Sequence, residues 1–252
     1  MGAPSPLGLL EGIATTRAIR RFRPDPIAES DLATMFFAAS RAPSGSNSQG
    51  FRFIVLRDGP VAAQAKVLLG RAFREQWVVK RQAEGIPTSA DPDSRLGRAL
   101  AAMDTFVQNF ESTPVVVIAC LIRQAAPSPR EGASIYPACQ NLLLAARALG
   151  CGGVFSMWHT AVEPELRSLL GIPDGVAISA TIPLGRPQGS HGPVRRRPLR
   201  ELVFEERWAE PAVWAVDPEG TSFTRGNQRP AWTGSLDDET AVVRSWQVTD
   251  GR

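Results

Sequence analysis

Hydrophobic and polar positions follow two different spacings along the chain up to Arg207. Apolar residues at helical spacing predict helices at 30–42, 61–80, 93–110, 133–150 and 163–172. Short apolar runs rich in β-branched residues predict strands at 51–58, 114–122, 152–158 and 175–185. Because helices and strands are mixed along the chain without strict alternation, the pattern favours a layered α+β domain over a doubly wound parallel sheet.

Capping residues mark the ends of two predicted helices. Ser30 is the expected N-cap of the first helix, which should stop before Pro43. Gly150 stands where a helix C-cap usually takes a left-handed conformation. The stretch APSGSNSQG at 42–50 follows the first helix, and its small and polar residues are typical of a turn. A helix, a small-residue loop and a strand therefore meet at this point.

The character of the sequence changes after Arg207. Gly, Pro, Thr and Ser are frequent there, as in irregular segments, yet the stretch also contains Trp208, Trp214, Trp232 and Trp246. Disordered segments are poor in aromatic residues. We therefore expect a folded domain over residues 1–208 and a tryptophan-containing extension over 209–252, which packs on the body or on a partner subunit.

Composition and charge exclude several classes of protein. A length of 252 residues with 43% hydrophobic residues fits a globular protein with a well-filled core. The 28 Lys and Arg residues are nearly balanced by 25 Asp and Glu, so no nucleic-acid or membrane partner is expected. The apolar run at 115–122 is too short to cross a bilayer, and the N-terminal residues do not resemble a signal peptide. A cytoplasmic protein is expected.

Most familiar catalytic and metal-binding motifs are missing from the sequence. Three cysteines and two histidines show no metal-ligand spacing, so no metal site is expected. The sequence has no P-loop, no complete Rossmann fingerprint, no G-x-S-x-G elbow and no H-E-x-x-H motif. The two histidines, His159 and His191, fit structural or surface roles better than catalysis. A hydrolase of a familiar kind is therefore not expected.

Two arginine clusters are the strongest candidates for binding chemistry. The stretch TTRAIRRFRPDP at 15–26 contains four arginines, and GPVRRRPLRELV contains Arg195, Arg196 and Arg197. Guanidinium groups in a loop can bind a phosphate dianion through forked hydrogen bonds. Each cluster can equally be a solvated charged surface. The sequence leaves both interpretations open, and the two clusters could also converge on one phosphate.

Four stretches, taken in this order, resemble the FMN-dependent nitroreductase superfamily. They are TTRAIRRFRPDPI, RAPSGSNSQGFRFIV, ASIYPACQNLLLAARALGCGGVF, and IPLGRP followed by GPVRRRPLRELV. Together they span roughly residues 14–208 and leave out the tryptophan-containing extension. The resemblance implies an α+β fold with a mixed sheet flanked by helices, in an intertwined homodimer with FMN at the subunit interface.

The resemblance also implies roles for particular residues. Arg17 and Arg196 would hold the flavin phosphate, and Arg20 would face N1 and O2 of the flavin ring. The 43–49 loop would hold the ring and the ribityl chain, and the 154–156 segment would direct a backbone N–H toward N5. The full implied set of FMN-binding residues is Arg17, Ala18, Arg20, Pro43, Ser44, Gly45, Asn47, Gln49, Val154, Phe155, Ser156, Arg195 and Arg196.

The sequence departs from the family pattern at three places. Thr16 and Ala18 replace an Arg and a Ser, Gly50-Phe51 replaces Pro-Trp, and Phe155-Ser156 replaces a Glu-Gly pair. The first departure puts one phosphate contact and one hydroxyl contact in question. The last indicates a different pocket around the flavin face.

The function implied by the resemblance is a hydride transfer in which the flavin carries the chemistry, so no catalytic side chain is needed. NADH or NADPH would give hydride to FMN, and a nitroaromatic, quinone or activated alkene would then accept it in a ping-pong sequence. One alternative is an FMN-dependent oxidase or dehydrogenase that desaturates a biosynthetic intermediate with oxygen as acceptor. Another is a flavin-binding or partner-binding protein without turnover.

Overall fold

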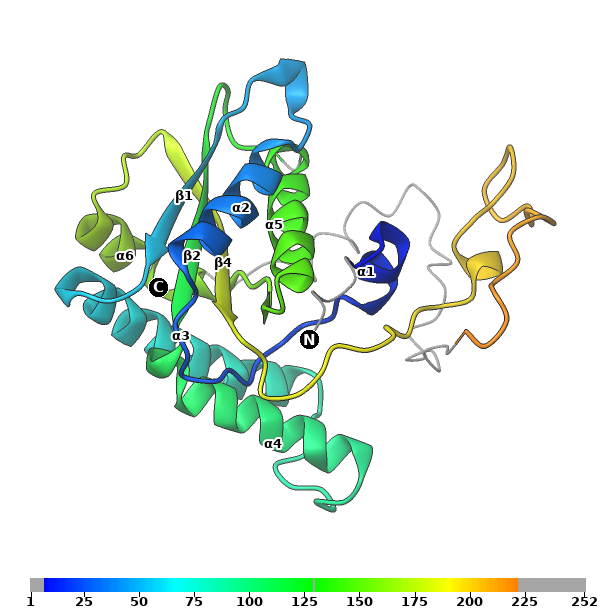
Figure 1. Cartoon of the computed structure of the whole chain (residues 1–252), viewed down its shortest axis with the longest axis horizontal. Coiled ribbons are helices and arrows are strands. Elements are labelled where there is room, and N and C mark those ends of the chain that lie inside the picture. The colour runs from blue at the N-terminus through cyan, green and yellow to red at the C-terminus, as the bar shows by residue number, and fades with distance from the viewer. Residues whose placement is uncertain (1–6, 129, 222–252) are drawn as a thin grey trace, which may run out of the picture. The chain divides into compact units, whose positions relative to one another are not determined.

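The computed structural model describes residues 7–128 and 130–221 of the chain. The chain divides into two compact units, residues 1–194 and 195–252, which are described separately. The helices of the first unit are α1 Leu9–Thr15, α2 Glu29–Ser40, α3 Pro60–Ala83, α4 Arg95–Gln108, α5 Tyr136–Ala148 and α6 Glu163–Leu170 (Figure 1). The strands are β1 Phe51–Leu56, β2 Val115–Ile122, β3 Gly152–Gly153 and β4 Val176–Gly185.

The strands form one sheet in the order β1-β2-β4-β3. Its three pairings are all antiparallel in the described residues, where a mixed sheet was expected. Phe51 at the start of β1 is opposite Leu121, near the end of β2. Val115 at the start of β2 is opposite Leu184, which also pairs with Gly153 of β3. The two ends of β2 therefore face different parts of the chain, and this separation matters for the site.

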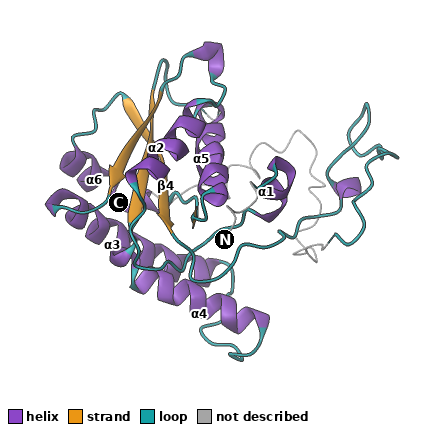
Figure 2. Cartoon of the chain, viewed as in Figure 1, coloured by secondary structure: helices purple, strands orange, loops and turns teal. Residues whose placement is uncertain are grey.

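Helices cover both faces of the sheet (Figures 1 and 2). Side chains along β2 alternate between the faces, as they must in a strand. Val117 and Ala119 belong to the cluster that α2 and α5 cover, whereas Ile118 and Cys120 belong to the cluster that α3, α4 and α6 cover. Both faces of β2 are thus buried, which explains the unbroken apolar run of its sequence.

Aromatic side chains fill the layer under α3 and α4. The ring of Phe73 lies 4.4 Å from that of Phe110 and 5.8 Å from that of Phe106, measured between centroids. All three side chains are at most 4% exposed. Burying a phenylalanine of this kind stabilises the fold by about 1.5–3 kcal/mol. This layer fixes the position of α4, which lines the cavities described below.

The structure confirms the α+β class and most of the predicted elements, with three differences. Helix α2, which was predicted to begin after Ser30, begins at Glu29. Its N-cap is Ala28 rather than Ser30, without a side-chain capping bond. The strand predicted at 152–158 is regular only over Gly152–Gly153, with a single further bridge at Ser156. Helix α1 was not predicted, because its apolar residues Leu9 and Leu10 remain exposed and give no core-facing pattern. No helix in the described ranges is both long and apolar enough to cross a membrane.

The second unit is described over residues 195–221 and is mostly irregular. It contains the short 3-10 helix Leu199–Glu201 and one bridge between Phe204 and Pro211. The indole of Trp208 lies 5.1 Å from the ring of Phe204, and the indole N–H of Trp214 donates to Glu205. Trp232 and Trp246 lie outside the described residues. The proposed division at residues 208 and 209 stays a prediction.

Candidate functional site

The first arginine cluster lies along the ends of β3 and β4. The main-chain N–H of Ile19 donates to the Gly153 carbonyl at 2.9 Å, and Phe22 forms a bridge with Pro187. A side chain at Gly152 would place its Cβ 2.7 Å from the Ile19 side chain. The small GG pair therefore lets residues 17–22 approach the sheet closely.

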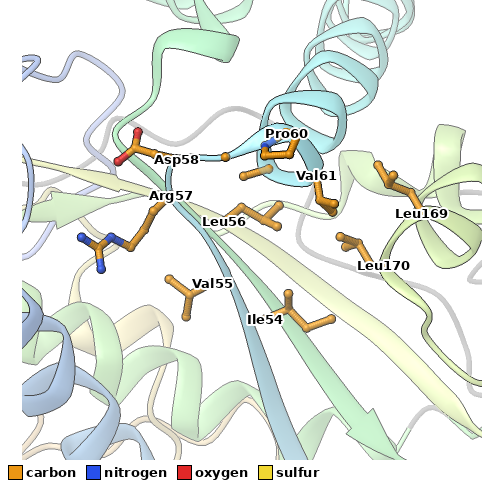
Figure 3. A pocket seen from close by; sticks show the side chains of 11 residues that line it. Ile54, Val55, Leu56, Arg57, Asp58, Pro60, Val61, Leu169 and Leu170 are labelled. Atoms are coloured by element: carbon orange, nitrogen blue, oxygen red, sulfur yellow. The ribbon is translucent and has the colours of Figure 1, made fainter.

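A cavity of about 660 Å³ is seen between β1, the start of α3 and the end of α6 (Figure 3). Figure 3 shows Val61 of α3 and Leu169 and Leu170 of α6 around it. Arg57 in its lining is paired with Glu29 at 2.8 Å, so its charge is already matched. None of the sequence-predicted site residues lines this cavity.

Arg20 lines two other large cavities of different character. The first, here called the basic cavity, has a volume of about 780 Å³. The arginines that line it are Arg17, Arg20, Arg21, Arg95 and Arg98. Ala18 also lines it, and its described lining includes no Asp or Glu. Such an arrangement can bind a phosphate, because guanidinium groups keep their charge at any working pH.

The second, here called the apolar cavity, has a volume of about 470 Å³. Its aromatic lining residues are Phe73, Trp77, Phe106, Phe155 and Trp158. Arg20 lines it as well, together with Val154, Ser156 and Lys80. Partial burial lowers the pKa of Arg20 below its usual value, although the group remains a cation near neutral pH. A flat aromatic ligand with one polar edge fits such a space.

Trp77 is held in the apolar cavity by α4. Its indole N–H donates to Asp104 Oδ1 at 2.6 Å, and the Arg81 guanidinium lies 5.5 Å from its ring centroid. Asp104 also pairs with Arg81 at 3.4 Å. The side chain of Trp77 is 6% exposed. These contacts fix one wall of the cavity.

The 154–156 segment leaves one backbone N–H outside its pairing with β4. The N–H groups of Val154 and Ser156 donate to Pro183 and Thr181 of β4, at 3.3 and 3.0 Å. Since successive N–H groups of an extended segment point in opposite directions, the Phe155 N–H points away from β4. None of the described backbone hydrogen bonds uses it. The Phe155 ring packs on Tyr136, with the centroids 5.1 Å apart.

The small-residue loop at 43–49 is a strained structure. Ser46, Asn47 and Gln49 have φ values of 51°, 52° and 48°, which side-chain-bearing residues adopt at a cost. The Gly45 N–H donates to Ser134 Oγ at 3.1 Å, and the Gln49 N–H donates to Ser44 Oγ at 2.9 Å. Strained loops of this kind are common at ligand sites.

The structure does not bring this loop to Arg20 of the same chain. The loop leads into Phe51, opposite Leu121, whereas the Ile19–Gly153 contact lies beside Leu184, opposite Val115. At about 3.3 Å per residue, the length of β2 separates these two places by on the order of 20 Å. Neither the basic nor the apolar cavity is lined by any residue of 43–49.

The structure thus groups six of the sequence-predicted residues around the two cavities. They are Arg17, Ala18, Arg20, Val154, Phe155 and Ser156. Pro43, Ser44, Gly45, Asn47 and Gln49 form the separate loop. Arg195 and Arg196 belong to the second unit, where Arg196 donates to the Arg195 carbonyl at 2.9 Å. Their part in the same site stays a prediction.

Sequence reasoning missed several residues that line the cavities. Trp77, Met103 and Phe106 lie within the predicted helices 61–80 and 93–110, and Arg95 and Arg98 lie at the start of the second of these. No local signal could have identified them, since only the packing of α3 and α4 brings them to Arg20. The sequence shows that Arg95 and Arg98 are close together, but it does not show that they lie beside Arg20.

Comparisons with known proteins show which family the chain resembles. The sequence model of the nitroreductase family matches residues 13–186. An NADH dehydrogenase of Thermus thermophilus is 32% identical over 198 residues, 75% of this chain and 91% of the relative. A 5,6-dimethylbenzimidazole synthase of Rhodospirillum rubrum is 27% identical over 207 residues, covering 78% and 89% of the two chains. A solved structure described as a nitroreductase in complex with FMN, from Desulfovibrio desulfuricans, is 25% identical with a TM-score of 0.55, covering 82% and 99%.

Proposed function

The chain belongs to the nitroreductase family, and from this premise we propose that it is an FMN-dependent oxidoreductase. It takes a hydride from NADH or NADPH and passes it to a nitroaromatic, a quinone or an activated alkene. The observation that carries the proposal is the position of Arg20, which lines the basic and the apolar cavity together.

The residues around Arg20 fit the chemical parts of FMN. The basic cavity suits the phosphate, which Arg17 would hold. The apolar cavity suits the isoalloxazine ring, whose pyrimidine edge Arg20 would face. The Phe155 N–H, which points away from β4, would donate to N5. When bound, FMN would supply the acceptance and return of hydride, and Arg20 would stabilise negative charge near N1 and O2. No side chain is needed as a nucleophile or base.

A second copy of the chain would complete the site. The 43–49 loop lies on the order of 20 Å along β2 from the Arg20 region, so a partner's loop must reach the ring if Ser44 and Asn47 bind it. Leu9 of α1 and Phe37 of α2 are 71% and 65% exposed, and they line a further cavity of about 460 Å³ with residues of α5. Exposed apolar surface of this kind is typical of subunit interfaces. We infer a homodimer that covers this surface.

An alternative function is supported by the departures near the flavin position. Phe155 and Ser156 line the apolar cavity, and the Phe155 ring is held against the ring of Tyr136. The similarity to a 5,6-dimethylbenzimidazole synthase shows that relatives bear names other than nitroreductase. An oxidase or dehydrogenase that uses oxygen is therefore the second candidate. A binding protein without turnover is the third.

A visible spectrum of the purified protein tests the proposal and separates its alternatives. We expect a yellow protein with bound FMN, whose flavin absorbance is bleached anaerobically by NADH or NADPH and restored by an acceptor such as a quinone. Protein that stays colourless after incubation with FMN would contradict the proposal. Bound FMN that neither nicotinamide reduces, but that a substrate and oxygen turn over, would favour the oxidase.

A further inference from the structure

The basic cavity holds more positive charge than one flavin phosphate can match. Five arginines line it, whereas a phosphate monoester carries about two negative charges near neutral pH. If Arg17 contacts that phosphate and Arg20 faces the ring, the two arginines of α4 still lack a counter-charge. These two are Arg95 and Arg98.

Arg95 and Arg98 have no carboxylate partner in the described part of the chain. They are three residues apart and therefore lie on the same side of α4. Arg98 donates to the main-chain oxygen of Asp93, a contact that neutralises no charge. The first turn of α4 contains no acidic residue, and the helix dipole disfavours cations there. No carboxylate in the described part of the chain therefore matches the charge of this pair.

The basic and the apolar cavity share a wall on α4. Ala99 and Met103 line both cavities, as does Arg20. A second ligand whose aromatic ring stacks on the flavin ring in the apolar cavity, and whose phosphates lie several bonds away, could therefore extend along α4 toward Arg95 and Arg98. A nicotinamide dinucleotide has this composition.

We propose that Arg95 and Arg98 bind a phosphate of the nicotinamide donor, at a subsite separate from that of the flavin phosphate. The proposal rests on the function proposed above. The phosphate can come from the pyrophosphate that NADH and NADPH share, or from the 2′-phosphate that NADPH alone carries. Both sources need the same forked, charge-assisted hydrogen bonds, which arginine provides.

Calorimetric titration of the FMN-loaded protein tests this subsite without turnover. The probes are 5′-ADP, which carries a pyrophosphate, and adenosine 2′,5′-bisphosphate, which carries the 2′-phosphate. In an Arg95→Ala/Arg98→Ala double variant we expect probe affinity to fall by about 10- to 100-fold, as for lost charge-assisted bonds. FMN affinity should remain within about twofold of the wild type, because other residues hold that phosphate.

The controls make the outcome specific. Arg71→Ala removes an exposed arginine of α3 that pairs with Glu165, outside both cavities, and should leave probe affinity unchanged. The Arg95→Lys/Arg98→Lys variant keeps the charge without the fork and should fall between the wild type and the alanine variant. A loss confined to the bisphosphate assigns the 2′-phosphate, a loss confined to 5′-ADP assigns the pyrophosphate, and an equal loss for both probes assigns the 5′-phosphate that both carry.

Two results would overturn the subsite. Equal probe affinity in the wild type and the double variant, including no affinity in either, makes the arginines a solvated helix surface. A fall in FMN affinity with unchanged probe affinity assigns them to the flavin phosphate instead. Failure of the proposed function is seen separately, as wild-type protein that binds no FMN.

Discussion

The two cavities that meet at Arg20 are built from different kinds of residue. Arg17, Arg21, Arg95 and Arg98 of the basic cavity are exposed side chains. Phe73, Trp77, Leu100, Phe106 and Val154 of the apolar cavity are buried members of the hydrophobic core. The exposed arginines of the basic cavity can change without disturbing the fold, whereas the buried residues of the apolar cavity are part of the hydrophobic core.

This difference shows where substitutions should act. Removing a buried aromatic group leaves a void and directly lowers the free energy of unfolding. Removing an exposed arginine costs little stability and acts through the ligand that it would bind. Stability and ligand affinity should therefore respond to different residues, although all of them lie around Arg20.

Trp77→Ala should have the largest effect, and it should act on stability. We expect the free energy of unfolding to fall by about 3–5 kcal/mol, the usual cost of removing a large buried aromatic side chain. Loss of the indole bond also leaves Asp104 with one partner fewer. Urea unfolding of the flavin-free protein measures this change. Arg71→Ala on the same helix is the control, expected to stay within about 1 kcal/mol of the wild type. If Trp77→Ala lowers the free energy of unfolding no more than the control does, the buried indole does not stabilise the core as expected.

Arg20→Ala should have the largest effect on FMN affinity, because Arg20 borders both cavities. Loss of charge-assisted bonds predicts a weakening of about 2–3 kcal/mol. Quenching of FMN fluorescence on binding provides the measurement. Arg20→Lys keeps the charge and should recover part of the affinity. Unchanged affinity in Arg20→Ala would separate the flavin from both cavities.

Arg17→Ala and Arg196→Ala test the phosphate contacts that the family resemblance implies. Each should weaken FMN binding by about 1.5–3 kcal/mol. The loss should shrink as salt concentration rises, since exposed charges are screened. A titration series at low and high sodium chloride measures both effects. If both variants bind FMN like the wild type at low salt, the arginines are plain surface charge.

The sequence predicted the fold better than the site. Helices and strands follow local patterns, whereas the site depends on contacts between residues far apart in the sequence. The buried run 115–122 and the helical spacing of 61–80 are local patterns, and the elements β2 and α3 follow them closely. Arg20 and Phe155 could be proposed through family motifs. Arg95, Trp77 and Met103 could not, because their place depends on how α3 and α4 pack against the sheet.

The position of the 43–49 loop relative to Arg20 could not be predicted for the same reason. Its turn chemistry was evident from its small residues, and the structure shows the positive φ values that such residues tolerate. Its distance from Arg20 depends on the register of β1 against β2, which no local pattern gives. The 43–49 loop and Arg20 can therefore form one site only across two chains, and no local pattern specifies that pairing.

The smallest predicted effect is a dependence of stability on pH. It should arise from a buried histidine next to the apolar cavity and not from the arginines of the basic cavity. His159 follows Trp158 of the apolar cavity, is 1% exposed, and its Nε2 lies 3.1 Å from the Ile178 carbonyl. Burial lowers the pKa of His159 below its usual value of 6.5, so the folded protein keeps it neutral where the unfolded chain binds a proton. Stability should therefore fall as pH drops through and below the ordinary histidine range.

Urea unfolding at about pH 8 and about pH 5 measures this loss, which His159→Gln should reduce because glutamine does not titrate in that range. Burial likewise lowers the pKa of His191. A His191→Gln variant therefore measures how much of the remaining pH dependence of stability His191 contributes. The arginines of the basic cavity stay charged over the same range and should contribute nothing to it. A pH dependence that survives both glutamine substitutions in full would place its origin in other groups and remove the histidines from the comparison.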